Sequence, residues 1–150
     1  MMTGDNSFES RLQDVTSQAA GFDRLRKARQ TEVAEDYVEL IADLLAEQGE
    51  ARAVDLAERF GVSHATVNKT LGRLAREGFV QTRPYRSIFL TEKGAALASQ
   101  ARRRHEIVLG FLMAIGVSPD TAAIDAEGIE HHVSKETLEV FEKILAGKSA

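Results

Sequence analysis

The sequence predicts a mostly α-helical protein in which a winged helix-turn-helix precedes a second, helical domain. Three observations support this fold class. Apolar residues recur with a helical period before residue 49 and again after residue 91. Between them lie two short helical segments, a glycine turn and a stretch rich in β-forming residues, in the order of a winged helix. This middle part also holds most of the basic charge of the chain.

The charge distribution indicates a nucleic-acid-binding segment, although the chain as a whole carries a net charge of −4. Residues 52–104 contain 11 Lys and Arg against 4 Asp and Glu, whereas residues 1–51 contain 5 against 11 and residues 105–150 contain 3 against 8. A basic segment between two acidic ones is typical of a nucleic-acid-binding module inside a larger protein. A randomly patchy surface is the alternative interpretation.

Composition excludes several classes of protein. The 150 residues, 43% of them hydrophobic, suffice for one ordinary core or two small ones. No run of about 18 apolar residues occurs and the N-terminus has no apolar block, so we expect a cytoplasmic protein without a membrane span or secretory signal. The absence of cysteine leaves carboxylates, imidazoles and backbone carbonyls as metal ligands.

The first half of the chain predicts three helices. A long amphipathic helix begins at Phe22 and ends at Gly49, a plausible C-cap. Two short helices follow at Val54–Phe60 and Ala65–Arg76, and Gly78 stops the second. Residues 1–21 are polar and are expected to form a flexible extension.

The second half predicts a hairpin and three more helices. Residues 79–90 alternate weakly around a central proline, as a short hairpin does. Thr91 is placed to cap a long helix that runs to about Ile115. A short helix then continues through Ile129, and Ser134 begins the last one.

The two short helices have the features of a DNA-binding helix-turn-helix. Ala57 allows close helix approach, Gly61 supplies a turn position with positive φ, and Ser63 caps the second helix. In this geometry the start of the second helix faces base edges, while basic residues further along it and on the hairpin contact phosphates. The candidate DNA contacts are Ser63, His64, Ala65, Thr66, Asn68, Lys69 and Arg73 on the helix and Arg83, Tyr85 and Arg86 on the hairpin. A generic helix pair followed by an unrelated hairpin is the alternative.

Candidate metal ligands lie on three helices around this module. They are Asp36 and Glu39 (i, i+3), His105, and Glu127, Glu130 and His131 (i, i+3, i+4). Helical residues at these spacings share a face, and their oxygen and nitrogen donors suit Mn(II) or Fe(II). His132 lies beyond that face. Each group taken alone is also compatible with a solvated, charged helix surface.

The sequence resembles the manganese transport regulators of the diphtheria-toxin-repressor family, in the short form without an SH3-like domain. The resemblance covers residues 32–145. The segments that carry it are Glu35-Asp36-Tyr37-Val38-Glu39, the helix-turn-helix, Arg104-His105-Glu106, Gly116-Val117-Ser118, and Asp125-Ala126-Glu127-Gly128-Ile129-Glu130-His131-His132-Val133-Ser134. The last block is highly specific in this context.

The resemblance implies a Mn(II)-dependent repressor of manganese uptake genes. It implies that the six candidate ligands form a site for two metal ions, with partly bridging carboxylates, in which Fe(II) or another divalent metal could substitute. In iron-responsive relatives the ligands include Met and Cys at the positions of Asp36 and Glu130 here, and this difference favours manganese. The chain departs from the family in an N-terminal extension of about thirty residues and in His64, Ala65, Asn68 and Gly72 of the recognition helix.

The expected mechanism joins the two domains through metal. Four converging carboxylates repel one another, and two divalent cations would neutralise them and lock the helices together. We divide the chain into a flexible extension (1–21), a winged-helix DNA-binding domain (22–91) and a helical dimerisation and metal-binding domain (92–150). The expected partners are double-stranded operator DNA and a second copy of the chain, without a membrane or a small organic substrate. The predicted dimer interface comprises Phe111, Leu112, Leu138, Phe141 and Leu145.

Two other interpretations keep part of this pattern. An Fe(II)-responsive or metal-independent regulator would retain the DNA-binding module and change the signal. A carboxylate-bridged metalloenzyme would need an open coordination position and a nearby acid or base, for which only His132 is left over. A purely structural dimer module is a further possibility. We therefore expect a regulator and not an enzyme.

Overall fold

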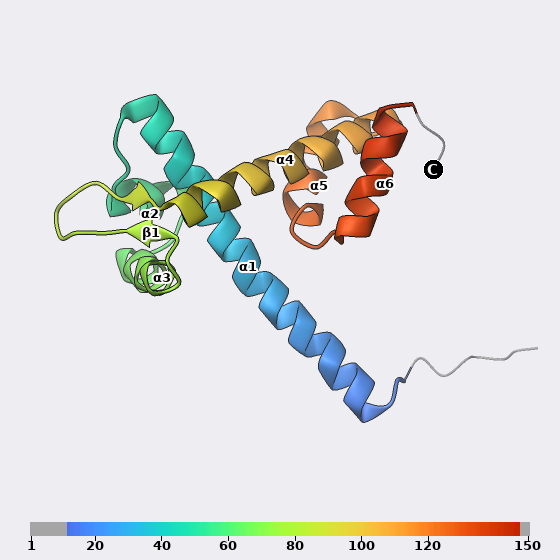
Figure 1. Cartoon of the computed structure of the whole chain (residues 1–150), viewed down its shortest axis with the longest axis horizontal. Coiled ribbons are helices and arrows are strands. Elements are labelled where there is room, and N and C mark those ends of the chain that lie inside the picture. Colours follow the sequence, from blue (N-terminus) through green and yellow to red (C-terminus); the bar gives the residue numbers. More distant parts are fainter. Residues whose placement is uncertain (1–11, 148–150) are drawn as a thin grey trace, which may run out of the picture.

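The computed structural model describes residues 12–147 and confirms a mostly helical fold (Figure 1). The described chain forms six helices and one two-stranded hairpin. The elements are α1 (Val15–Gln48), α2 (Ala53–Phe60), α3 (His64–Arg76), β1 (Val80–Gln81), β2 (Phe89–Leu90), α4 (Glu92–Ala114), α5 (Pro119–Ile129) and α6 (Lys135–Leu145). Among these helices, none is long and apolar enough to cross a membrane.

Helix α1 begins earlier than predicted. Residues 15–21 were assigned to a flexible extension, but they form the first two turns of a 34-residue helix, and the Asp14 side chain caps it by accepting from the backbone N–H of Ser17 at 3.0 Å. The N-terminal half extends away from the other helices (Figure 1), so the apolar residues Val15 and Phe22 are exposed and leave no buried stripe to detect. Residues 12–14 of the expected extension precede the helix, and residues 1–11 lie outside the described part of the chain.

The winged helix forms around the C-terminal half of α1. Gly49 ends α1 and Gly61 ends α2, both with positive φ, and the Ser63 hydroxyl caps α3, as predicted. The hairpin is antiparallel, with Val80 opposite Leu90. One apolar cluster holds these elements together; its largest buried members are Tyr37, Ile41, Leu44, Leu56, Val67, Leu71, Leu74, Val80 and Ile88.

The N-cap and first turn of α4 pack against the residues that follow the helix-turn-helix. The Thr91 hydroxyl donates to the carbonyl of Gly78 at 2.6 Å, and its backbone N–H donates to the carbonyl of Phe79 at 3.1 Å. Gly94 is buried at this crossing, where a Cβ would lie 2.0 Å from the Phe79 carbonyl oxygen. A side chain at this position would force the hairpin away from α4.

Helix α4 carries the second domain, because it packs against both α5 and α6 as well as α1 (Figure 1). The rings of Phe111 and Phe141 stack at a centroid distance of 3.8 Å, and Leu145 lies against Gly110. Part of the predicted dimer interface is thus used inside one chain. Leu145, another predicted interface residue, remains exposed, and the other exposed large apolar residues of this domain are Met113, Ile115, Ile124, Ile129 and Ile144.

Candidate metal centre and DNA-binding surface

The six predicted ligands come together where α1, α4 and the end of α5 meet. Asp36 and Glu39 lie on α1 and His105 lies on α4. Helix α5 ends at Ile129, so Glu130 is its C-cap residue and His131 stands in the turn that follows. Because Glu130 keeps helical φ and ψ, the backbone still turns both side chains toward α1 and α4.

Glu130 occupies the centre of the cluster. It is 2% exposed, and its two carboxylate oxygens point to different histidines. Oε2 lies 2.8 Å from His105 Nδ1, and Oε1 lies 3.3 Å from His131 Nε2. Oε2 is close to the His105 ring but accepts no well-aligned hydrogen bond. It is therefore a buried, unsatisfied hydrogen-bond acceptor. A carboxylate in this arrangement can bridge two cations.

The other ligands surround these two histidines. Asp36 Oδ1 lies 3.1 Å from His131 Nε2, and Glu127 Oε1 lies 3.8 Å from His105 Nδ1. The donor atoms therefore divide into a group around His105 and a group around His131, and Glu130 contacts both.

Burial and nearby carboxylates raise the pKa values of two acidic residues in the cluster, and hydrogen bonds to carboxylates raise the pKa of His131. Burial raises the pKa of Glu39 to about 7, with further upward contributions from Glu130, Asp36 and Glu127. Burial also raises the pKa of Glu130 to about 7, although the charge of His131 opposes this shift. Burial lowers the pKa of His131, but hydrogen bonds to carboxylates outweigh it and raise the value to about 10.

Two compact sets of donors have mutual distances within 4.8 Å: His105 with Glu127 and Glu130, and Glu32 with Asp36 and His131. Glu39 belongs to neither set; burial is the main cause of its raised pKa, and Glu130, Asp36 and Glu127 add to it. Glu32 was missed by the sequence analysis. Its spacing to Asp36 (i, i+4) places both on one face of α1 and could have revealed it. Glu32 Oε2 also lies 3.0 Å from Nε2 of His132, a histidine that belongs to neither donor set.

Two further charged residues that the sequence analysis did not include lie directly behind the cluster. Glu35 on α1 is 2% exposed, and it pairs with Arg104 on α4 and with His131. Both residues belong to segments that carry the family resemblance, but nothing in their spacing distinguishes them from surface charges.

The predicted recognition helix is α3, and the surface at its N-terminal end is exposed. The Ser63 hydroxyl accepts from the backbone N–H of Thr66 at 3.1 Å and so defines the start of the helix. Five of the predicted DNA contacts are exposed here: His64, Ala65, Thr66, Asn68 and Lys69. A groove of about 720 Å³ separates this surface from the wing, and both His64 and Arg86 line it.

Arg73 is placed differently from the prediction. Its Nη2 donates to the Gln30 carbonyl of α1 at 3.2 Å, and its Nε lies 3.8 Å from Glu77. The side chain is 30% exposed. Because it donates to the Gln30 carbonyl, it joins α3 to α1. Sequence spacing placed Arg73 on the outer face of α3 but could not reveal the carbonyl beside it.

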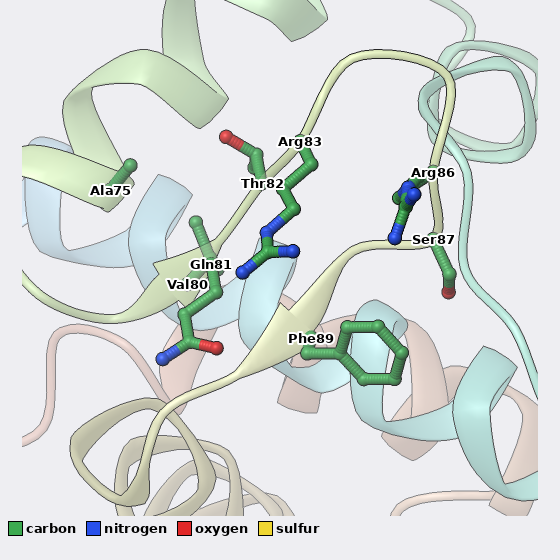
Figure 2. Close-up of a pocket in the computed structure, with 8 residues that line it drawn as sticks. All are labelled: Ala75, Val80, Gln81, Thr82, Arg83, Arg86, Ser87 and Phe89. Carbon is green, nitrogen blue, oxygen red and sulfur yellow. The ribbon is translucent and has the colours of Figure 1, made fainter.

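The wing presents its basic residues from both arms of the hairpin. Figure 2 shows a pocket on the wing with Thr82 and Arg83 on the outgoing arm and Arg86 and Ser87 on the returning arm. The Ser87 hydroxyl accepts from the backbone N–H of Ala51 at 3.0 Å and anchors the returning arm to the module. Tyr85 at the tip is fully exposed and has a φ of 59°. Arg83 and Arg86 are exposed as well, so all three predicted wing contacts are accessible.

A winged helix followed by a helical domain with a carboxylate and imidazole cluster defines a class of DNA-binding regulator, and family comparisons agree. Residues 30–88 match the model described as "Iron dependent repressor, N-terminal DNA binding domain". Residues 91–147 match "Iron dependent repressor, metal binding and dimerisation domain". The chain belongs to the iron-dependent repressor family, which is the family of the diphtheria toxin repressor.

Individual relatives narrow this assignment. The chain is 53% identical to the transcriptional regulator MntR of Salmonella typhimurium over 132 residues, which are 88% of this chain and 84% of the relative. It is 54% identical to MntR of Escherichia coli O157:H7 over 121 residues, which are 81% and 78% of the two chains. These relatives are transcriptional regulators, which confirms the expectation that the chain is a regulator and not an enzyme.

A solved structure supports the same grouping. A manganese-dependent transcriptional repressor in complex with manganese has a TM-score of 0.68 and 30% identity, and the match covers 75% of this chain and 52% of that one. The match thus spans about half the length of the solved repressor.

Proposed function

We propose that this chain is a Mn(II)-responsive, homodimeric transcriptional repressor that binds operator DNA when its metal cluster is loaded. The observation that carries the proposal is the position of Glu130, whose two oxygens face His105 and His131 from inside the cluster. Relatives named as MntR and the manganese complex of a solved repressor support Mn(II) as the signal.

The donor set fits this metal. It contains carboxylate oxygens and imidazole nitrogens and lacks the soft sulfur ligands of other metal sites. The buried acceptor on Glu130 is left without a well-aligned donor, as expected for an atom intended for a cation. We propose two ions per subunit, held by His105, Glu127 and Glu130 on one side and by Asp36, Glu39, Glu130 and His131 on the other. Fe(II) or another divalent metal could substitute.

The chain's own residues would convert metal binding into a change of domain geometry. Asp36 and Glu39 stand on α1, and the remaining ligands follow the wing on α4 and at the end of α5. Without metal, repulsion among the four carboxylates opposes the close approach of these helices. When bound, divalent cations supply the positive charge that removes this repulsion. The carboxylates then hold α1 against α4 and restrict the orientation of the DNA-binding module.

The operator complex follows from the same arrangement. In a two-fold dimer, two copies of α3 would enter adjacent major grooves about one helical turn, roughly 34 Å, apart. We propose that His64, Ala65, Thr66 and Asn68 read bases from the start of α3. Lys69 and the wing residues Arg83, Tyr85 and Arg86 would contact the backbone. Thr91, which caps α4, would mark the boundary between the DNA-binding domain and the metal-binding domain. Operator DNA would place its site of action in the cytoplasm.

The test is a titration of operator binding against metal. With wild-type protein, Mn(II) should strengthen binding and a chelator should abolish it, and parallel titrations with Fe(II) rank the metals. Glu130→Ala should raise the Mn(II) concentration needed for operator binding. The increase should exceed the roughly 10–100-fold change that is typical when a residue supporting a ligand is lost. Glu139→Ala is the matched control, because Glu139 is an exposed residue of α6 that pairs only loosely, at 3.9 Å, with Lys135. Unchanged Mn(II) dependence in Glu130→Ala would refute the proposed site.

A further inference from the structure

A buried charge outside the proposed ligand set lies directly behind His131. Glu35 is 2% exposed, and such a carboxylate is costly to bury unless both oxygens are compensated. Oε1 forms an ion pair with Arg104 of α4, and Oε2 lies 2.7 Å from His131 Nδ1. The carboxylate therefore joins the guanidinium of one helix to the imidazole that follows another.

The two nitrogens of His131 have separate surroundings. Nδ1 faces Glu35, whereas Nε2 faces the cluster, at 3.1 Å from Asp36 Oδ1 and 3.3 Å from Glu130 Oε1. An imidazole binds a cation through one nitrogen, and a hydrogen bond at the other nitrogen selects which one is free. The contact with Glu35 thus leaves Nε2 as the nitrogen available to the cluster.

We propose that Glu35 is a positioning residue for the metal centre, holding the His131 ring with its proton on Nδ1 and its Nε2 directed at the cation, and that Arg104 holds Glu35 in place. This inference rests on the proposed function, because it assigns a role toward the same metal. Glu35 and Arg104 do not themselves contact the cation. Each immediately precedes a proposed ligand, Asp36 on α1 and His105 on α4.

Each supporting residue faces a different side of its helix from the ligand that follows it in the sequence. Successive helical residues are rotated by roughly 100°, so a ligand and the residue before it face different sides of the same helix. The ligands of α1 and α4 therefore face the cluster, while Glu35 and Arg104 meet on a second side and support His131 from behind. One ion pair in this way sets both the spacing of two helices and the orientation of a ligand on a third segment.

The substitution that separates positioning from packing is Glu35→Gln. Glutamine has the same shape, but its amide nitrogen presents a donor to one of two partners that both require an acceptor. We expect Mn(II) binding, measured by calorimetry or by the paramagnetic resonance signal of free Mn(II), to weaken by about 10–100-fold. Circular dichroism of the metal-free protein should show an unchanged helical content. Arg103→Gln is the matched control beside Arg104, since Arg103 is an exposed residue that pairs with Glu142 at 2.5 Å.

A spectroscopic readout tests the orientation itself. In protein loaded with diamagnetic Zn(II) and labelled with ¹⁵N-histidine, long-range proton–nitrogen spectra should show His131 protonated on Nδ1 and metal-bound through Nε2. Glu35→Gln should shift the Nδ1 resonance and reduce the metal-bound population, whereas Arg103→Gln should change neither. Identical His131 spectra and Mn(II) affinities in wild type and Glu35→Gln would overturn the positioning role.

Two further variants keep the outcomes distinct. If Glu35→Gln fails to fold, Arg104→Lys retains the charge while losing the planar guanidinium, and the inference requires it to lower Mn(II) affinity and perturb the same resonance. Unchanged values would refute the inference. Glu130→Ala tests the site as a whole: if it abolishes Mn(II) binding while Glu35→Gln leaves binding intact, the proposed function stands and the positioning role falls. If wild-type protein itself binds no Mn(II), the proposed function fails.

Discussion

Three ionisable side chains at the centre of the cluster hold protons that a divalent cation must displace. Glu39 and Glu130 have pKa values raised to about 7, and His131 has a pKa of about 10. Raised carboxylate pKa values mean that both acids are largely protonated at pH 6 and largely ionised at pH 8. His131 remains protonated across this range, so its proton must leave whenever the ring binds metal.

This predicts that Mn(II) affinity rises with pH while the number of released protons falls. From these three side chains, binding should release roughly three protons at pH 6 and roughly one at pH 8. Calorimetry in buffers of different ionisation enthalpy measures this number directly. Proton release that does not change between pH 6 and pH 8 would contradict the assignment of Glu39 and Glu130 to the metal centre.

Arg73 and Lys69 distinguish a structural cation from a DNA-binding one on the same helix. Lys69 is exposed on α3, whereas Arg73 donates to the Gln30 carbonyl of α1. Lys69→Ala should reduce the slope of log affinity against log salt by about 0.9 per subunit, and so by about 1.8 for the dimer, because each subunit loses one phosphate contact. Arg73→Ala should leave the slope unchanged and lower the melting temperature instead. Equal salt slopes in wild type and Lys69→Ala would remove Lys69 from the DNA contacts.

At the scale of elements, two glycines differ in what their neighbours require. A Cβ at Gly94 would meet the Phe79 carbonyl at 2.0 Å, whereas a Cβ at Gly72 would lie 3.5 Å from the flexible end of Arg76. Gly94→Ala should therefore destabilise the protein by about 1–3 kcal/mol. Gly72→Ala should stabilise α3 by up to about 1 kcal/mol. Thermal unfolding of both variants checks the pair, and a Gly94→Ala variant as stable as wild type would contradict the close crossing of α4 and the hairpin.

Gly72→Ala has a second use. No side chain or backbone of the described protein requires glycine at this position of the recognition helix. If the variant is stable but binds operator more weakly, the requirement for glycine comes from the DNA. Unchanged operator affinity would show that the DNA does not approach this part of α3.

Local sequence signals predicted the elements well, because caps and glycine turns act over a few residues. Gly49 and the other caps of the winged helix have the conformations expected from their residue types. The start of α1 was missed because its first turns are exposed and only Asp14 marks them. Contacts across helices were harder to foresee. The roles of Arg73, Glu32 and Glu35 depend on partners 43 to 100 residues away, which helical periodicity does not report.

At the scale of the whole molecule, α1 belongs to both domains at once. Tyr37, Ile41 and Leu44 lie in the core of the winged helix, while Asp36 and Glu39 of the same helix reach the cluster. Helix α4 likewise leaves the wing through Thr91 and carries His105 to the cluster. A change in helix positions at the metal site would therefore be transmitted to the DNA-binding module through α1 and α4, each of which is continuous between the two.

If Mn(II) joins these helices through Glu130, anomalous scattering from crystals of the Mn(II)-loaded protein should locate the metal at this carboxylate. Two manganese peaks per subunit are expected, one on either side of the Glu130 carboxylate. One peak should lie beside His105 and Glu127, and the other beside Asp36 and His131 Nε2. Manganese peaks located elsewhere, or none between α1 and α4 in crystals that contain the metal, would contradict this arrangement.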